Sequence, residues 1–167
     1  IVWDDFLFVG TCFSEDYRNY KTARTNEYAI EILKEYFPKK RIIDLDLKKN
    51  DKVPYQGVLH LDCTFNPIGK DKCIIYKDGF VDESDYQLII DIFGEENCFH
   101  ITPEEMFEMN PNIFSISPEV VVSDETFTRM NDFLRNEWGF TVEEIPYREI
   151  SKMGGLLRCS TMPLVRE

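Results

Sequence analysis

Long hydrophobic runs are missing from this sequence, and so are closely spaced cysteine pairs. No apolar stretch approaches about twenty residues and no charged-then-apolar signal pattern is visible, so we expect no membrane partner. The cysteines are odd in number and show no CxxC spacing. This pattern argues against a disulfide scaffold or a zinc ribbon and favours a reducing, cytoplasmic compartment. The five cysteines are Cys12, Cys63, Cys73, Cys98 and Cys159.

Basic residues and histidines are also scarce. Lysine and arginine number 19 against 31 aspartates and glutamates, which gives a formal net charge of −12 and an isoelectric point of about 4.6. A field of this sign repels phosphate backbones, so we expect no nucleic-acid partner. His60 and His100 are the two histidines that could serve acid–base chemistry near neutral pH.

The residues that are present suit one globular domain. The 167 residues are 43% hydrophobic and 14% aromatic, enough to bury a core. The chain starts at Ile1 rather than at methionine, and its first three residues resemble the interior of a strand. We therefore expect 1–167 to be a single, incomplete domain that lacks an N-terminal portion. Its exposed strand edges would lower its stability or lead it to form a homo-oligomer.

Hydrophobic spacing predicts an α/β chain with a repeated order of strand pair, helix and strand. The expected helices cover 26–37, 84–94, 102–110 and 127–139, and the expected strands cover 5–13, 43–47, 58–65, 73–76, 120–122 and 140–145. Asn26 is a candidate N-cap, and capping-box patterns begin at Ser84 and Thr102. A repeat period of about forty residues indicates a radial or stacked array. The three repeated units would be 5–47, 58–102 and 112–145.

The first helix is expected to bury one face, and the segment after the 58–65 strand is expected to turn. The apolar residues on that helical face are Ala29, Ile32, Leu33, Tyr36 and Phe37. The sequence Asn-Pro-Ile-Gly at 66–69 has the composition of a turn.

The C-terminal stretch GGLLRCSTMPLVRE (154–167) contains the candidate nucleophile. Paired glycines allow a positive φ or a close approach of the backbone to another group. We expect Gly154 and Gly155 to mount Cys159 at the start of a strand-like run. The alternative is that Cys159 is a small buried hydrophobic residue, which is the usual role of a free cysteine. The other four cysteines are interpreted in that way.

His60 and Asp62 lie two residues apart in the expected strand 58–65, which puts both side chains on one face. An imidazole beside a carboxylate can act as an acid–base and positioning pair. The alternative is a core histidine that is hydrogen-bonded by its neighbour. Asp62 needs a partner in an apolar strand, because an unpaired buried carboxylate is costly. Either a cationic ligand or a structural arginine would serve.

Two segments together resemble one enzyme family. HLDCTFNPIG (60–69) is similar to the His-x-Asp strand of the guanidino-group-modifying enzymes, the arginine deiminase and amidinotransferase superfamily. GGLLRCSTMPLVRE is similar to their C-terminal nucleophile strand, in which Gly-Gly precedes the catalytic cysteine and Pro-Leu-x-Arg follows it. The resemblance implies the pentein fold, an α/β-propeller of five ββαβ units around a pseudo-fivefold axis. This chain would supply about three C-terminal units of the five.

The resemblance also implies roles for individual residues. Cys159 matches the nucleophile that attacks the guanidinium carbon and forms a covalent amidino intermediate. His60 matches the acid–base that protonates the leaving amine and then activates water, and Asp62 matches a carboxylate that hydrogen-bonds the guanidinium group. Arg24 is similar to an arginine that binds the substrate carboxylate, although Arg18 competes for that match.

Arg158 precedes the cysteine as in arginine deiminases, whereas many amidinotransferases have histidine there. It could bind a ligand carboxylate or pair with one of the many acidic residues. The resemblance implies no metal and no cofactor. The family takes further guanidinium-binding carboxylates from a Glu-Gly-Gly-Asp run that this sequence does not contain. We therefore expect this chain alone to hold the nucleophile and the base but not the full substrate pocket.

The implied function is cysteine-dependent hydrolysis of a small guanidine, with arginine to citrulline and ammonia as the leading instance. Amidino transfer to an amine is one alternative, and a non-catalytic binding protein of the pentein fold is another. Selective alkylation of Cys159 by a guanidine-like electrophile would favour the enzyme. Equal, slow reactivity of all five cysteines would favour the binding protein.

Overall fold

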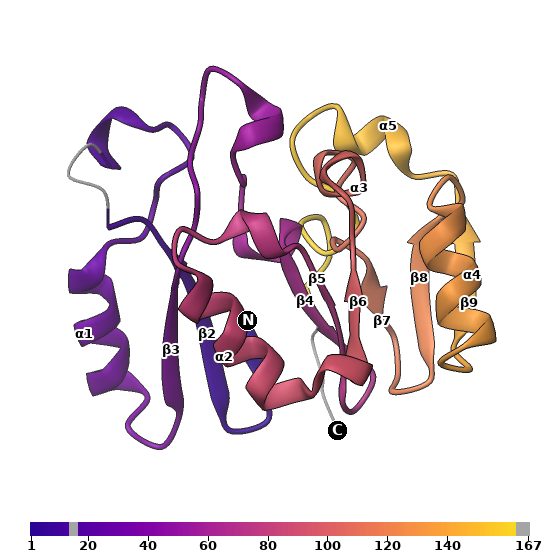
Figure 1. The fold of residues 1–167 in the computed structure, drawn as a ribbon, viewed down its shortest axis with the longest axis horizontal. Coiled ribbons are helices and arrows are strands. Elements are labelled where there is room, and N and C mark those ends of the chain that lie inside the picture. The colour runs from indigo at the N-terminus through magenta and orange to yellow at the C-terminus, as the bar shows by residue number, and fades with distance from the viewer. Residues whose placement is uncertain (14–16, 163–167) are drawn as a thin grey trace.

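The structure, a computed structural model, describes residues 1–13 and 17–162 (Figure 1). These residues form three separate three-stranded sheets, ordered β1-β2-β3, β4-β5-β6 and β7-β8-β9. In each sheet the first two strands pair antiparallel and the last two pair parallel. The three predicted units are therefore confirmed. Within the described residues the sheets stand in a row and do not close into a ring.

Every unit has the order strand, strand, helix, strand. The first unit contains β1 (Val2–Trp3), β2 (Phe6–Thr11), α1 (Glu27–Tyr36) and β3 (Arg41–Asp46). The second contains β4 (Phe65–Ile68), β5 (Lys72–Ile75), α2 (Glu83–Phe93) and β6 (Cys98–His100). The third contains β7 (Phe114–Ser115), β8 (Val120–Asp124), α4 (Thr128–Asn136) and β9 (Thr141–Ile145). Two short helices, α3 (Pro103–Phe107) and α5 (Arg148–Ser151), lie outside this pattern.

Two hydrophobic clusters join the three units. The cluster between the first and second units includes Phe8, Leu45, Phe65, Ile75 and Ile89. The cluster between the second and third units includes Ile74, Ile113, Met130, Leu134 and Leu156. Strand β5 serves both, because successive side chains of a strand point to opposite faces. Burial on both faces explains why the segment 73–76 is a continuous apolar run.

Helix-end signals in the sequence were mostly reliable. Asn26 caps α1 with its side chain, and Thr102 and Glu105 form a reciprocal capping box at the start of α3. Gly94 ends α2 with a φ of +83°. The predicted capping box at Ser84 is wrong, since α2 already begins at Glu83. There the carboxylate of Asp85 accepts the backbone N–H of Asp46 at 2.8 Å, which ties α2 to the first unit.

Two further predictions about local structure are wrong. Helix α1 buries Ile30, whereas Ile32, Tyr36 and Phe37 on the predicted face are 38%, 75% and 48% exposed. The segment 66–69 is mostly strand β4, and the chain turns only at Gly69, where φ is +60°. Residues 66–68 pair with β5 instead of turning, because all of them are buried between the neighbouring units.

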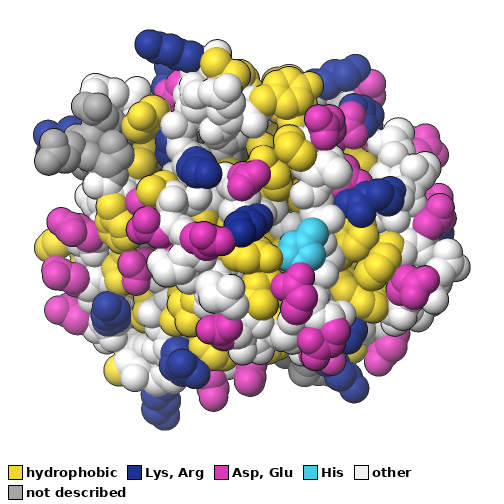
Figure 2. All heavy atoms as spheres, viewed as in Figure 1, with side chains coloured by type: hydrophobic (Ala, Val, Ile, Leu, Met, Phe, Trp, Pro, Cys, Tyr) yellow, Lys and Arg dark blue, Asp and Glu magenta, His cyan; other side chains and the backbone are white. Residues whose placement is uncertain are grey.

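The excess of acidic residues is spread over the surface. Figure 2 shows acidic side chains across the whole of the visible face, with lysines and arginines between them. The net charge of −12 is therefore not gathered in one patch on this face. None of the helices in the described ranges has the length and apolarity that a membrane span requires.

Candidate active site

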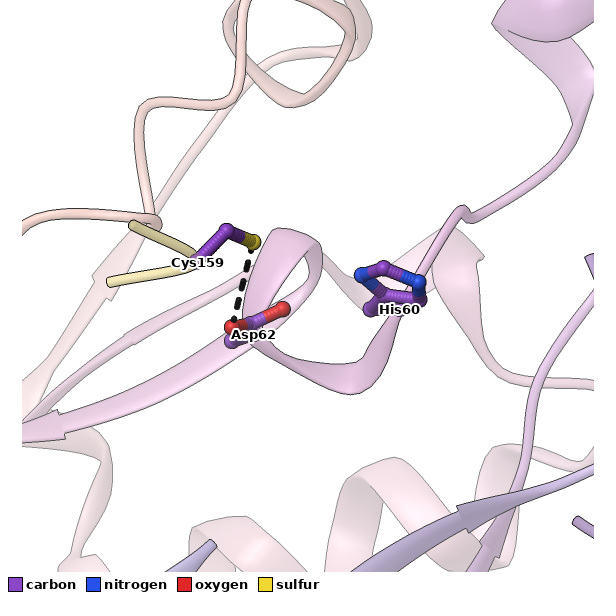
Figure 3. Close-up of side chains that lie close together, drawn as sticks. All are labelled: His60, Asp62 and Cys159. Carbon is purple, nitrogen blue, oxygen red and sulfur yellow. Dashed lines mark hydrogen bonds between the residues drawn. The ribbon is translucent and has the colours of Figure 1, made fainter. Parts of the chain in front are cut away.

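Three chemically active side chains converge at one place in the structure. The reactive atoms of His60, Asp62 and Cys159 all lie within 4.8 Å of one another (Figure 3). Asp62 and Cys159 are 97 residues apart in the sequence, so the fold itself creates this group. The structure thus brings together the two segments that the sequence had singled out.

The His60–Asp62 segment reaches the site through a tight turn rather than a strand. A short 3₁₀ helix covers Leu61–Cys63, with His60 as its extended N-cap residue. The predicted strand 58–65 is therefore wrong, and strand β4 starts only at Phe65. Leu61 and Cys63 are buried and anchor the turn. His60 and Asp62, which alternate with them, are half-buried. The two side chains share the site because of this turn, and not because of strand alternation.

Lys49 holds the chain just before the histidine. Its ammonium group donates hydrogen bonds to the carbonyl oxygens of Val58 and Leu59, at 2.9 and 3.0 Å. Burial lowers the pKa of Lys49. The sequence analysis missed this role, because the partners of Lys49 are backbone atoms that no side-chain pattern reveals.

Cys159 lies in a turn, so the prediction of a strand start is wrong. The backbone N–H of Ser160 donates to the carbonyl oxygen of Leu156 at 3.2 Å, which curls the chain around the cysteine. Both expected uses of the glycines occur. Gly154 has a φ of +83°, and a Cβ at Gly155 would lie 2.9 Å from the Cβ of Cys159. The Pro-Leu-x-Arg part of the predicted motif, at 163–166, lies outside the described residues.

Cys159 differs from the other cysteines in exposure. It is the one exposed thiol, whereas Cys12, Cys63, Cys73 and Cys98 are buried. The interpretation of those four as packing residues agrees with this burial. Burial is the main cause that raises the pKa of the Cys63 thiol above its ordinary value, and the Asp62 carboxylate raises it further. Selective chemistry is therefore expected at Cys159.

The electrostatics of the ligand-free site favour neutral groups. Although Cys159 is exposed as a residue, partial burial of its sulfur raises the pKa of the thiol, and the nearby Asp62 carboxylate raises it further. The thiol donates to Oδ2 of Asp62 at 3.7 Å, the contact drawn in Figure 3. Burial lowers the pKa of His60, an effect that Asp62 partly offsets. Near pH 7 the ligand-free site therefore holds a thiol and a neutral imidazole.

The two arginines predicted to bind substrate lie in different surroundings. Arg24 lines a cavity of about 300 Å³ together with His60, Lys49 and Thr11. The guanidinium group of Arg158 instead donates to Oδ1 of Asn66 at 2.6 Å. Arg24 thus lines the same cavity as the histidine, and Arg158 contacts an amide beside the turn of Cys159.

A buried asparagine completes the site and was missed by the sequence analysis. Asn112 is 0% exposed, and its amide nitrogen donates to the sulfur of Cys159 at 3.2 Å. No sequence pattern around Asn112 indicates this contact, because the partner is 47 residues away in the sequence. Imidazole, carboxylate and thiolate could also hold a divalent cation. The amide N–H of Asn112 that points at the sulfur supplies a polar partner for a thiolate.

We expect Asp62→Asn to make Cys159 more reactive toward iodoacetamide. The substitution removes the negative charge that helps to hold the pKa of Cys159 above its ordinary value. The thiolate is the reactive form, so alkylation at pH 7 should become roughly 3- to 10-fold faster. Peptide mass analysis would quantify labelling at Cys159. Asp91→Asn, on the exposed side of α2, is the matched control and should leave the rate unchanged. An unchanged or slower rate in Asp62→Asn would contradict the electrostatic account.

Comparison with known proteins places this chain in a family. Residues 79–166 match the family model of arginine deiminase. The protein YkgA of Bacillus subtilis (strain 168) is 29% identical over 167 residues, which cover 99% of this chain and 50% of that protein. The arginine deiminase of Latilactobacillus sakei subsp. sakei (strain 23K) is 39% identical over 67 residues, 40% of this chain and 16% of that enzyme.

Solved structures agree on the fold. The N-terminal domain of ArgZ, an arginine dihydrolase from the ornithine–ammonia cycle in Cyanobacteria, superposes with a TM-score of 0.73 at 19% identity. The match covers 93% of this chain and 50% of that one. SxtG, an amidinotransferase from Microseira wollei, gives a TM-score of 0.67 at 20% identity over 85% of this chain and 42% of that one.

The chain therefore spans about half the length of the B. subtilis relative and of the ArgZ domain. The family-model match covers more than half of the chain and includes the segment of Asn112 and the turn of Cys159. The α/β fold of this chain superposes on about half of the ArgZ domain and on 42% of SxtG. On these grounds the chain belongs to the arginine deiminase family, within the pentein superfamily of guanidino-group-modifying enzymes.

Proposed function

We propose that the protein is a guanidino-group-modifying enzyme that uses Cys159 as its nucleophile and hydrolyses arginine or a closely related guanidine. The convergence of a thiol, an imidazole and a carboxylate within 4.8 Å, in a chain of the arginine deiminase family, carries the proposal. A guanidinium carbon is a weak electrophile with a delocalised positive charge. It needs a carboxylate to hold it, a soft nucleophile and a proton donor for the departing nitrogen.

The substrate cation activates the nucleophile in this mechanism. When the guanidinium group binds Asp62, its positive charge offsets the carboxylate that now raises the pKa of Cys159. The thiol proton passes to the neutral imidazole of His60, which leaves a thiolate beside an imidazolium. The thiolate then attacks the guanidinium carbon and forms the C–S bond of a tetrahedral intermediate.

His60 serves both halves of the reaction. Its imidazolium protonates the departing nitrogen, and for arginine this C–N bond breaks to release ammonia. A covalent S-alkylamidino intermediate stays on Cys159. The neutral imidazole next takes a proton from water, the resulting hydroxide attacks the same carbon, and the C–S bond breaks. For arginine the product is citrulline, and the thiolate regains its proton from His60.

The rest of the substrate pocket is proposed from the lengths of the relatives. Since the chain spans about half of them, we propose that it supplies three of five propeller units and forms one incomplete domain. The missing units would contribute further guanidinium-binding carboxylates. Arg24 is proposed to bind the substrate carboxylate, because it lines the same cavity as His60. The five free thiols support a reducing, cytoplasmic location.

Acid-quenched intact-mass analysis tests the proposal on the full-length protein that includes this chain. Incubation with arginine should trap an adduct on Cys159, with citrulline in the supernatant. An adduct without citrulline, but with amidino transfer to an added amine, would replace the hydrolase by an amidinotransferase. A folded protein that forms no adduct with any guanidine would overturn the proposal in favour of a non-catalytic binding protein.

A further inference from the structure

Asn112 lies where the chain passes from α3 to β7, and it is fully buried. A buried amide must satisfy both its oxygen and its nitrogen to be tolerated. Asn112 does this entirely on the turn that carries the nucleophile. Its Oδ1 accepts the backbone N–H of Leu156 at 3.1 Å and that of Cys159 at 3.2 Å. Its Nδ2 donates to the sulfur of Cys159 at 3.2 Å.

The backbone of the same residue adds a further contact. The carbonyl oxygen of Asn112 accepts the N–H of Arg158 at 3.2 Å. Three backbone N–H groups of the turn, those of Leu156, Arg158 and Cys159, thus donate to one residue. The turn cannot shift against Asn112 without breaking several hydrogen bonds at once, so the position of the sulfur is set from this side.

Asn66 connects this arrangement to the other half of the site. Its Nδ2 donates to the carbonyl oxygens of Pro111 and Ile113, at 2.6 and 3.1 Å, on either side of Asn112. Asn66 is itself buried in β4. It lies three residues after Cys63, where the turn that carries His60 and Asp62 ends. The acid–base segment and the nucleophile turn are therefore joined through two buried amides.

The charges around the sulfur make the amide N–H important. Asp62 faces Cys159 as an acceptor, His60 lies within 4.8 Å of the group, and the thiol of Cys63 is close by. Once a guanidinium group occupies Asp62, the carboxylate is engaged by the substrate. Asn112 is then the remaining described side chain that donates a hydrogen bond to the sulfur. A donor to the charged form favours that form.

We propose that Asn112 is the positioning residue of the nucleophile, which orients the Cys159 turn through Oδ1 and stabilises the thiolate through Nδ2. The inference rests on the proposed function only in taking Cys159 as the nucleophile. The two atoms of this amide have different roles. The oxygen sets the position of the Cys159 turn, and the nitrogen sets the reactivity of the sulfur.

Two substitutions separate these two tasks. Asn112→Asp keeps an oxygen that can accept from Leu156 and Cys159, but it replaces the donor to sulfur with an acceptor. Asn112→Ala removes both. We expect alkylation of Cys159 by iodoacetamide at pH 7 to be roughly tenfold slower in Asn112→Asp, with the whole pH–rate profile moved to higher pH. In Asn112→Ala it should be about threefold slower, since the donor to the sulfur is lost, as in the aspartate variant, but no negative charge is added.

Asn110→Ala is the matched control. Asn110 is buried to a similar degree, and its Oδ1 has no hydrogen-bond partner among the described residues. Removal of the Asn110 side chain should leave the pH profile of Cys159 alkylation unchanged. In the full-length protein, Asn112→Asp should lower kcat more than it changes KM, because the thiolate matters in the chemical step.

Alkylation needs no substrate, so this test is independent of the proposed reaction. A folded Asn112→Asp protein with the wild-type pH profile would overturn the inference even if the enzyme turns over arginine. A thermal melt would reveal whether the aspartate variant folds. If it does not, the same measurement on Asn112→Ala decides, and a wild-type pH profile in that variant would also overturn the inference. Absence of turnover in wild-type protein would overturn the proposed function and leave the shifted profiles unaffected.

Discussion

Replacing Cys159 with serine is expected to lower turnover of any guanidine substrate by about 10³-fold or more and to abolish the covalent adduct. The serine hydroxyl ionises far less readily than a thiol, so neither His60 nor the substrate charge can convert it to a useful nucleophile. Substrate binding should change little, because Asp62 and Arg24 remain. Steady-state kinetics and acid-quenched intact mass, on the full-length protein, measure both effects.

Cys98→Ser is the matched control for this substitution. The thiol of Cys98 is buried and donates to the carbonyl oxygen of Gly94 at 3.2 Å, a hydrogen bond that a serine hydroxyl can keep. Its activity should stay close to that of the wild type. Full activity in Cys159→Ser, or an adduct found on another cysteine, would show that the nucleophile has been wrongly assigned.

His60→Asn should lower kcat by about 10²- to 10⁴-fold, the usual contribution of a general acid–base, with a smaller change in KM. Asparagine has a similar shape but cannot accept the thiol proton, protonate the departing nitrogen or activate water. Each of these steps depends on His60 in the proposed mechanism. The effect should therefore fall on the chemical steps rather than on binding.

The pH dependence provides a second signature of His60. The active form of the free enzyme carries a neutral imidazole and a protonated thiol, so kcat/KM should follow a bell-shaped curve. Because burial lowers the pKa of His60, the acid limb should lie below its ordinary value of 6.5. Because burial and Asp62 raise the pKa of Cys159, the alkaline limb should lie above 9.0.

The acid limb should disappear in His60→Asn and persist in His100→Asn. His100 is the other histidine of the chain and lies on β6, where its ring nitrogen is 2.9 Å from the carboxylate of Glu95. Loss of the acid limb in the His100 variant, or its survival in the His60 variant, would assign the titration to a group other than His60.

Local sequence signals were sufficient for the repeated architecture. The order of strand, strand, helix and strand follows from apolar spacing and from helix-end residues such as Asn26 and Gly94, whose partners lie within a few residues along the chain. The sequence also supplied the chemical types of the site, since a histidine, an aspartate and a cysteine preceded by two glycines are visible without any fold.

Tertiary structure alone decided how those residues meet. His60 and Asp62 share the site through a 3₁₀ turn where strand spacing was expected, and Cys159 sits in a turn rather than a strand. The turns are stabilised by Lys49 and Asn112, whose partners are mainly backbone atoms of other segments, which for Asn112 are distant in the sequence.

The physical reason is the range of the interactions. Caps and apolar periodicity depend on neighbours along the chain, so they can be recognised in a sequence. A buried amide is tolerated only when the folded chain brings it matching donors and acceptors, and for Asn112 these come from 44 and 47 residues away. The sequence by itself therefore determined the repeated units and the reactive groups, and only the packing of the units determined the geometry in which those groups can react.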